Sequence, residues 1–305
     1  MPDRMVWTGP DGSTVDLTDW GAGFFQTEGA TGMQSPAWAL STSQLAGVDV
    51  VSVDALRAGP REVSLPMYLR AGSKQELRMK LRGLVHTMRP KAGAGALRVS
   101  TEWGTSRTLN CYCTGGLEGD TSLKIGGTGP WWRCVLKLFA ADPWWYGDPV
   151  TVGFGLAEPA IFWSTTLPQP RSLSSSSIQG QRDIDLSDSD DPTPGLWTIT
   201  GPGVGLTLTR QLLLPDGTVD PAPTATRSLV SSAAIPDGVG VVIRTKFGQQ
   251  SIRRGDGTNL GGTLAAGSTF WSLVDGRVNR VSIQLGGAGG ASKAEMVYQP
   301  KFGGS

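Results

Sequence analysis

The stretch "GPWWRCVLKLFAADPWWYGDP", residues 129–149, gathers large aromatic side chains into one short segment: Trp131, Trp132, Trp144, Trp145 and Tyr146. From Trp132 to Ala140 every second residue is apolar or a cysteine, a period of two that predicts a strand with one buried face. A stacking platform for a ligand needs an exposed ring, whereas an anchor of the fold needs a buried one. Because Trp132 shares its strand face with leucines, we interpret these aromatic residues as a structural anchor that closes one domain.

One helix is predicted upstream of this segment, over residues 73–89, "SKQELRMKLRGLVHTMR". Ser73 followed three residues later by Glu76 is a capping-box signature, and Pro90 ends the helix. Its apolar residues recur at helical spacing and form one stripe: Leu77, Leu81, Leu84, Val85 and Met88. We expect this stripe to pack on the strands and the basic residues between to face solvent.

Other segments of the first half also alternate and are predicted as strands. They are "DVVSVDAL" (49–56), "REVSLPMYL" (61–69), "ALRVSTEW" (96–103) and "SRTLNCYC" (106–113). In the third, Trp103 shares a face with Leu97 and Val99, so it is expected to be buried. Pro66 suggests that the second segment lies at a sheet edge or carries a bulge, since proline cannot donate to a ladder.

The amino-acid composition limits the classes of protein to which this chain can belong. A chain of 305 residues can form two domains that each bury a core. A net charge of +1 gives no sign of affinity for nucleic acid or anionic membrane, and a charged fraction of only 17% is typical of chains that bury surface in an assembly. Gly 43 and Pro 20 favour many turns and a mainly β fold. We expect neither a signal peptide nor a membrane-spanning segment.

After Pro149 the sequence changes character. Residues 151–195 are rich in Ser, Pro and Asp, which predicts a linker and loops with the first strand of a second domain. Residues 196–305 hold short apolar segments between Pro-Asp-Gly and Asp-Gly turns, which predicts a β-sandwich. The short strand predicted within 151–195 is "RDIDL" (182–186), and the strands predicted within 196–305 include "GLTLTRQLLL" (205–214), "GVGVVIRTKF" (238–247), "STFWSLV" (268–274) and "RVSIQL" (280–285). The first predicted domain is 1–150.

Few residues here predict catalysis or metal binding. His86 is the single histidine, and no nucleophile and carboxylate pattern accompanies it. Cys111, Cys113 and Cys134 lack the spacing of a zinc site, so we expect reduced, buried thiols. The acidic run at 188–191 lacks the pattern of an EF-hand. We expect no catalytic residue, metal or cofactor, although a glycosidase's two carboxylates follow no local spacing, so an enzyme acting on cell-wall polymers stays an alternative.

The order of the segments resembles a known family. The strand "VSLPMYL", the basic helix, the return "ALRVSTEWGTSRTLNCYCTGGLEG" and the closing "FAADPWWYG" follow one another as in the distal tail proteins of bacteriophages with long, non-contractile tails, in the form found in phages of actinobacteria. The segments "LWTITGPG", "VVIRTKFGQQSIRRGDGTNL", "STFWSLVDGRVNRVSIQLGGAGG" and "MVYQPKF" resemble the second domain of that family. The resemblance covers nearly the whole chain.

This resemblance implies a fold and a role. The implied fold is a tail-tube-like β domain with one packed helix, followed by a galectin-like β-sandwich. The implied role is structural and not enzymatic: a ring, of six copies in the family, at the distal tail tip of the virion, assembled in the cytoplasm of the bacterial host. The implied partners are other copies of the chain, the tail-tube protein, the tail-associated hub protein, the C-terminal region of the tape-measure protein, and receptor-binding or other baseplate proteins.

The alternative function is a carbohydrate-binding module that attaches to host cell-wall glycans. The likeness to galectins selects residues for a glycan-binding or protein-docking surface in the second half: Trp163, Arg254, Asn259, Trp271 and Arg277. Galectins hold sugar with a histidine, an asparagine and an arginine beside a stacking tryptophan, and no histidine follows His86 here. That departure favours protein docking or a purely structural role for the second domain.

Overall fold

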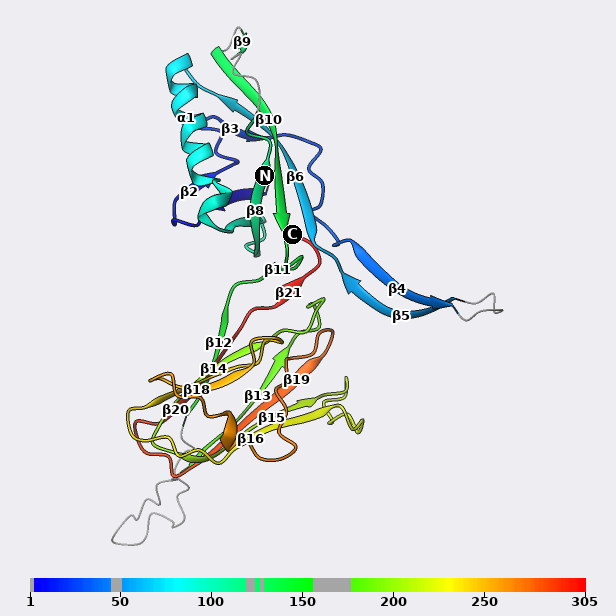
Figure 1. The fold of residues 1–305 in the computed structure, drawn as a ribbon, viewed down its shortest axis with the longest axis vertical. Coiled ribbons are helices and arrows are strands. Elements are labelled where there is room, and N and C mark those ends of the chain that lie inside the picture. Colours follow the sequence, from blue (N-terminus) through cyan, green and yellow to red (C-terminus); the bar gives the residue numbers. More distant parts are fainter. Residues whose placement is uncertain (1–2, 45–50, 119–123, 127–128, 156–176) are drawn as a thin grey trace. The chain divides into compact units, whose positions relative to one another are not determined.

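The computed structural model describes residues 3–44, 51–118, 124–126, 129–155 and 177–305. The chain forms two compact units, one of Met1–Asp148 with Phe302–Ser305 and one of Pro149–Lys301 (Figure 1). Each unit buries a hydrophobic core of its own. The return of the last residues to the first unit is a feature that the sequence did not predict. The fold is mainly β with one packed α-helix in the described residues, as predicted.

The first unit is built on a large antiparallel sheet in the order β2-β1-β7-β8-β10-β6-β3. The strands of this unit are β1 Arg4–Thr8, β2 Thr14–Asp16, β3 Phe24–Gln26, β4 Trp38–Gln44, β5 Val51–Ala58, β6 Arg61–Arg70, β7 Gly95–Ser100, β8 Ser106–Gly115, β9 Lys124–Gly126, β10 Gly129–Ala140 and β11 Trp145–Tyr146, and β21 Lys301–Phe302 pairs with β11. The predicted alternation of β10 is confirmed, because Trp132, Leu136 and Leu138 are buried while Arg133 and Lys137 are exposed.

Helix α1, Lys74–Thr87, covers the buried face of this sheet, and a short 3₁₀ turn follows at Pro90–Ala92. Ser73 is the N-cap as predicted, and its hydroxyl accepts a hydrogen bond from the backbone N–H of Glu76 at 3.1 Å. The Glu76 carboxylate reaches back to the N–H of Gly72 at 2.9 Å, one residue earlier than in a standard capping box. The bond from Glu76 to Ser73 satisfies a donor that the first turn of a helix leaves unpaired.

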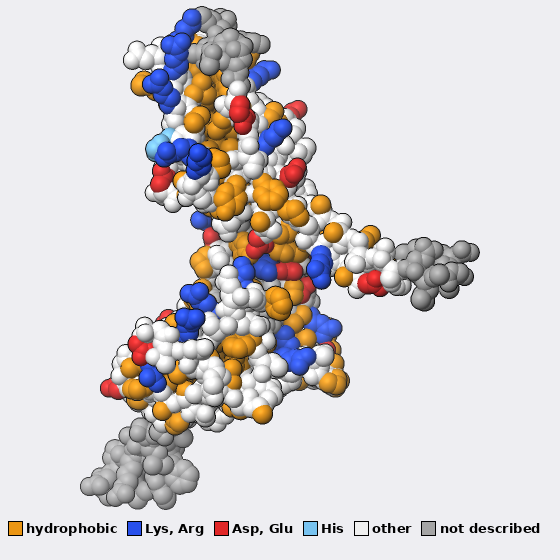
Figure 2. Space-filling view, in the orientation of Figure 1, with side chains coloured by type: hydrophobic (Ala, Val, Ile, Leu, Met, Phe, Trp, Pro, Cys, Tyr) orange, Lys and Arg blue, Asp and Glu red, His pale blue; other side chains and the backbone are white. Residues whose placement is uncertain are grey.

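The apolar stripe of α1 is narrower than predicted. Leu77, Leu84 and Met88 are fully buried in the core, and Leu81 packs against it while partly exposed. Val85 is 45% exposed, so its predicted burial is wrong. Successive helical residues are about 100° apart, and Val85 lies one such step from Leu84, at the border of the stripe. Lys74, Arg78 and Arg82 are exposed, as predicted (Figure 2), whereas Lys80 is partly buried and donates to the carbonyl of Arg70 at 3.2 Å.

Two strand predictions need correction. Trp103 is 85% exposed, because β7 ends at Ser100 and the chain turns there, with the N–H of Thr101 donating to the carbonyl of Thr105 at 2.9 Å. Pro66 lies on neither an edge strand nor a bulge, since β6 pairs with β10 on one side without a register shift and with β3 on the other. Pro66 has no backbone N–H to donate to a neighbouring strand. That donor would point toward the place where β3 ends, so few hydrogen bonds of the sheet are lost.

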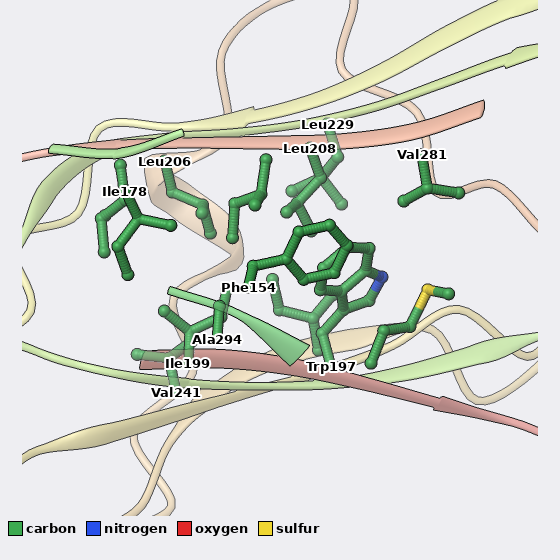
Figure 3. Close-up of a cluster of buried hydrophobic side chains, with 14 of the residues drawn as sticks. Phe154, Ile178, Trp197, Ile199, Leu206, Leu208, Leu229, Val241, Val281 and Ala294 are labelled. Atoms are coloured by element: carbon green, nitrogen blue, oxygen red, sulfur yellow. The ribbon is translucent and has the colours of Figure 1, made fainter. Parts of the chain in front are cut away.

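The second unit is a β-sandwich, as predicted. One sheet has the order β12-β20-β14-β17-β18 and the other β13-β19-β15-β16. The bounds are β12 Val150–Phe154, β13 Ser177–Asp185, β14 Gly195–Thr200, β15 Val204–Leu212, β16 Thr226–Ser231, β17 Gly240–Arg244, β18 Ser251–Arg254, β19 Val278–Gly286 and β20 Lys293–Tyr298, with a 3₁₀ turn at Gly261–Thr263. Figure 3 shows side chains from both sheets meeting in the core, where Phe154 stacks on Trp197 with ring centroids 5.5 Å apart.

The segment 268–274 is the one predicted strand of the second half that does not form. It makes a single isolated bridge, between Leu273 and Thr193, and otherwise runs as a loop. Its apolar residues are buried all the same, with Leu273 0% and Trp271 5% exposed. The alternation therefore predicted correctly that residues of this segment are buried, but it predicted wrongly that they pair as a strand. The region 151–195, predicted as linker and first strand, contributes β12 and β13 to this unit.

Candidate functional site

A two-stranded ribbon, formed by β4 and β5, is the first candidate interaction surface. Among the described strands these two pair only with each other, and Figure 1 shows them running away from the main sheet of the first unit. Apolar side chains stay exposed along it (Figure 2): Trp38 50%, Leu40 62%, Val53 61% and Leu56 56%. An isolated pair of strands is marginally stable in water, and exposed apolar patches mark interaction sites. The ribbon is therefore suited to docking on another surface.

The root of the ribbon is held by aromatic contacts. Trp38 meets Trp144 edge to face, with ring centroids 6.1 Å apart at 70°, and its indole N–H donates to the hydroxyl of Ser35 at 3.2 Å. A hollow of about 630 Å³ opens beside it, lined by residues that include Trp38, Pro36 and Pro60. The base of the ribbon is thus fixed to the anchor segment, residues 129–149. Beyond Trp38 the ribbon makes no such aromatic contact with other described residues.

The solvent side of the main sheet carries the second candidate surface, which we name the aromatic face: Trp20, Phe25, Tyr68, Trp131 and Arg133. Neighbouring rings follow one another at 5.8, 5.7 and 5.6 Å between centroids, ending in the stacked pair of Tyr68 and Trp131. The guanidinium of Arg133 lies 5.6 Å from the Tyr68 ring and 5.4 Å from the Trp131 ring. Aromatic residues and arginine are enriched in the energetically dominant parts of protein interfaces, so this face also fits a protein partner.

The predicted anchor residues divide between the two sides of the sheet. Trp132, Trp144 and Trp145 are buried, with 8%, 7% and 0% of their surface exposed. Trp131 lies on the aromatic face, and Tyr146 is half-buried, with its hydroxyl donating to Asp142 at 2.6 Å. The three buried rings pack with the core of the first unit or with Trp38. An anchoring role for all five stays a prediction.

Arg61 secures the anchor segment and was not singled out from the sequence. Arg61 is 2% exposed, and its guanidinium donates to four backbone carbonyls, those of Pro143 at 2.6 Å, Gly32 at 2.8 Å, Gln34 at 2.5 Å and Gly303 at 2.5 Å. It also lies 6.0 Å from the centre of the Trp145 ring. A signal for it was available: Arg61 stands in the buried phase of β6, two residues before Val63. A cation in that phase must find partners inside the fold.

The predicted surface of the second unit is not brought together as one site. Trp271 is buried and meets Trp197 edge to face at 6.2 Å. Arg254 and Asn259 flank one tight turn after β18, where the side chain of Asn259 accepts from the N–H of Gly261 at 2.9 Å. Arg277 lies in another loop and pairs with Asp220 at 2.6 Å. Trp163 lies outside the described residues. Of the four described residues, Trp271 is the aromatic one and its ring is buried. The three polar residues therefore have no exposed aromatic ring from this set beside them.

The thiols of the first unit are held protonated. Burial raises the pKa of Cys111 and of Cys134 to about 12, and it also raises the pKa of Cys113. A protonated thiol is a poor nucleophile and a poor metal ligand. His86 is exposed on α1, with its imidazole 3.7 Å from the carboxylate of Asp11.

Neither a metal cluster nor a membrane helix was found in the described part of the chain. Within those residues, no three His, Cys, Asp or Glu side chains gather closely enough to hold a metal ion. The same residues contain no helix of the length and apolarity needed to cross a membrane.

Comparisons with known proteins give a match in fold but not in sequence. No family model matches the chain, and no curated protein matches it. The Dit protein of phage SPP1, presented as a paradigm of the hub adsorption apparatus in phages that infect Gram-positive bacteria, is similar with a TM-score of 0.61 and 15% identity, over 99% of this chain and 100% of that one. A chain of the phage P2 baseplate in its activated conformation with Ca is similar with a TM-score of 0.50 and 13% identity, over the full length of both. The chain therefore has the fold of phage tail hub and baseplate proteins.

Proposed function

We propose that this chain is a structural protein of the phage tail tip, a distal tail protein that forms a ring through its first unit and offers its second unit to other tail-tip proteins. The observation that carries the proposal is the match in fold to the SPP1 Dit protein, which extends over 99% of this chain and all of that one. A match of that extent includes both units of the chain. The segment order seen in the sequence supports the same conclusion.

The two exposed surfaces of the first unit support ring formation. A closed ring of identical copies is built from head-to-tail contacts, so each copy must present two different patches that fit each other. The ribbon and the aromatic face are two such patches, both rich in apolar side chains. We propose that the ribbon of one copy docks on the first unit of the next. Burying the exposed surfaces of Leu40, Val53 and Leu56 there would add to the stability of the ring.

The finer parts of the role come from the family resemblance. We propose six copies in the ring, placed in the virion between the tail-tube protein and the tail-associated hub protein, around the C-terminal region of the tape-measure protein. Receptor-binding or other baseplate proteins would dock on the outside, and assembly would take place in the cytoplasm of the bacterial host. The role is structural, with no chemical step assigned to the chain.

The test is the solution mass of the purified chain over a range of concentrations, with negative-stain images of the largest species. We expect closed rings from the wild type. The variant Leu40→Glu should remain monomeric at an unchanged melting temperature, because this side chain is 62% exposed in the single chain. The matched control is Phe247→Glu, the same kind of change at a residue that is 90% exposed in the second unit.

The outcomes separate the ring from its interface. A wild type that stays monomeric at every concentration would count against ring formation by the chain alone. Rings formed equally well by Leu40→Glu would count against the ribbon as the contact, while leaving the ring in place. Loss of rings in the Phe247→Glu control would show that any added charge prevents assembly, which would remove the support for a specific interface.

A further inference from the structure

Arg210 is a buried cation whose hydrogen-bonding capacity is only partly used. It lies on β15 in the core-facing phase, between Leu208 and Leu212, and is 6% exposed. One terminal nitrogen donates to the carbonyl of Ser272 at 2.9 Å and the other to that of Thr224 at 3.1 Å. Its Nε is buried and has no hydrogen-bond partner among the described residues. A guanidinium has five N–H donors, and leaving buried donors unmatched is costly.

The charged neighbour of Arg210 is a second cation. Arg227 stands directly opposite on β16, in register with Arg210, and its side chain makes no ion pair with a described residue. No carboxylate pairs with Arg210 in the described part of the chain either. Burial, and after it the charge of Arg227, lower the pKa of Arg210. Two neighbouring cations without a counter-ion repel each other, and a bound anion would relieve that repulsion.

A pocket opens at these two arginines. It has a volume of about 450 Å³ and is lined by Arg210, Arg227, Thr224 and the segment 269–272. Small-molecule sites in proteins have volumes of about 300–1,000 Å³, with a few polar groups set among apolar walls. Here Phe270 and Trp271 supply the apolar part, while the threonines and Ser272 add hydroxyl groups near the two cations. The pocket is larger than a single phosphate or carboxylate group requires.

We propose that this pocket is an oxyanion-binding site of the second unit, which holds a phosphate or carboxylate group of a larger ligand between Arg210 and Arg227. The planar guanidinium presents paired N–H donors that match the two oxygens of either group, and such charge-assisted bonds are short and strong. The apolar wall would contact the uncharged part of the ligand. The site lies wholly within the second unit and does not depend on ring formation by the first.

A purely structural role for Arg210 makes different predictions. In that case its two bonds would only pin the loops at Thr224 and Ser272 to β15. Arg227, which contributes no hydrogen bond to either loop, would then be dispensable, and no oxyanion would show saturable binding. Arg227 is therefore the residue to change, because it is exposed and can be replaced without removing a hydrogen bond or ion pair to a described residue.

The experiment is a titration of the full-length chain with inorganic phosphate, acetate, D-glucuronate and D-glucose at constant ionic strength. Binding is measured by calorimetry and by the shift in melting temperature. We expect saturable binding of at least one oxyanion with one site per chain. Arg227→Gln should weaken that binding about tenfold, because it removes one of two charged contacts. The matched control is Arg253→Gln, the same change at an exposed arginine of β18 in the other sheet, with an expected effect below about twofold.

Each outcome decides the proposal or its ligand class. Binding of phosphate without the carboxylates would assign a phosphate-bearing ligand, and tighter binding of D-glucuronate than acetate would assign an anionic sugar. No saturable binding of any oxyanion, or equal affinity in Arg227→Gln and Arg253→Gln, would overturn the proposal. Binding of D-glucose as tight as D-glucuronate would also overturn it, since the anionic group would then contribute nothing.

Discussion

Replacing Arg61 by methionine tests whether one buried side chain holds the anchor segment to the first unit. Methionine fills a similar volume and keeps the stem apolar, but it cannot donate a hydrogen bond. The change removes the four bonds to the carbonyls of Gly32, Gln34, Pro143 and Gly303. Three separate stretches of backbone lose their common donor at once: the loop before the ribbon, the anchor segment and the C-terminal residues.

The expected cost follows from the number of acceptors left behind. A hydrogen bond to a charged group contributes about 1.5–3 kcal/mol, and an acceptor buried without a partner costs about 1–3 kcal/mol. The four bonds share one cation whose burial was itself unfavourable, and water can reach some of the freed carbonyls, so the total is smaller than the sum. We expect a loss of about 3–5 kcal/mol in the free energy of unfolding. For a unit of roughly 150 residues this lowers the melting temperature by about 10 °C.

The assay is differential scanning calorimetry of the full chain, with Arg280→Met as the matched control. Arg280 also makes two short bonds, to Asp183 at 2.8 and 2.9 Å, but this pair is on the surface of the second unit. Its loss should change stability little, because an exposed ion pair contributes little in water. Arg61→Lys should fall between the two, because an ammonium reaches fewer of the carbonyls. A melting temperature for Arg61→Met within about 2 °C of that of Arg280→Met would refute the reasoning.

Two further predictions concern the same unit. Leu84→Ala should destabilise the protein by about 2–5 kcal/mol in urea unfolding, whereas Val85→Ala on the neighbouring exposed position should change stability by less than about 0.5 kcal/mol; equal effects would contradict the observed stripe. The pKa of Cys111, raised to about 12 by burial, implies stability that is fully present below about pH 9 and is lost as pH rises toward 12. Between pH 8 and 10 the wild type should lose about 1–2 kcal/mol more than Cys111→Ala, and an identical loss in both would argue against it.

The elements that the sequence predicted well are those in which a local pattern and the tertiary fold agree. The alternation of β10 and the cap of α1 depend on residues close together in the chain, and both formed as expected. Trp103 shows where a local pattern stops being informative. The alternation continues into residues 101–105, but a tight turn begins after β7 and carries the ring into solvent. A period of two cannot show where a strand ends.

The ribbon and the aromatic face could be predicted only in part. The segment 49–56 was expected to be a strand, and β5 covers most of it. The absence of any third described strand beside β4 and β5 is a matter of topology, which periodicity does not encode. The rings of Phe25, Tyr68 and Trp131 come from three strands that lie far apart in the chain, so their contact depends on strand order and register.

Arg61 and Arg210 carry the same signal in the sequence, and comparing them shows what the sequence leaves open. Each stands in the buried phase of an alternating strand, where a charge is costly unless it is matched. Arg61 is matched by four carbonyls, one of them 242 residues away, and so acts as a pin within the fold. Arg210 has two carbonyls and a second arginine beside it. The sequence can therefore show that a buried cation needs partners, but only the fold shows whether the chain supplies them. Where it does not, as at Arg210, the proposed oxyanion would supply the missing counter-charge.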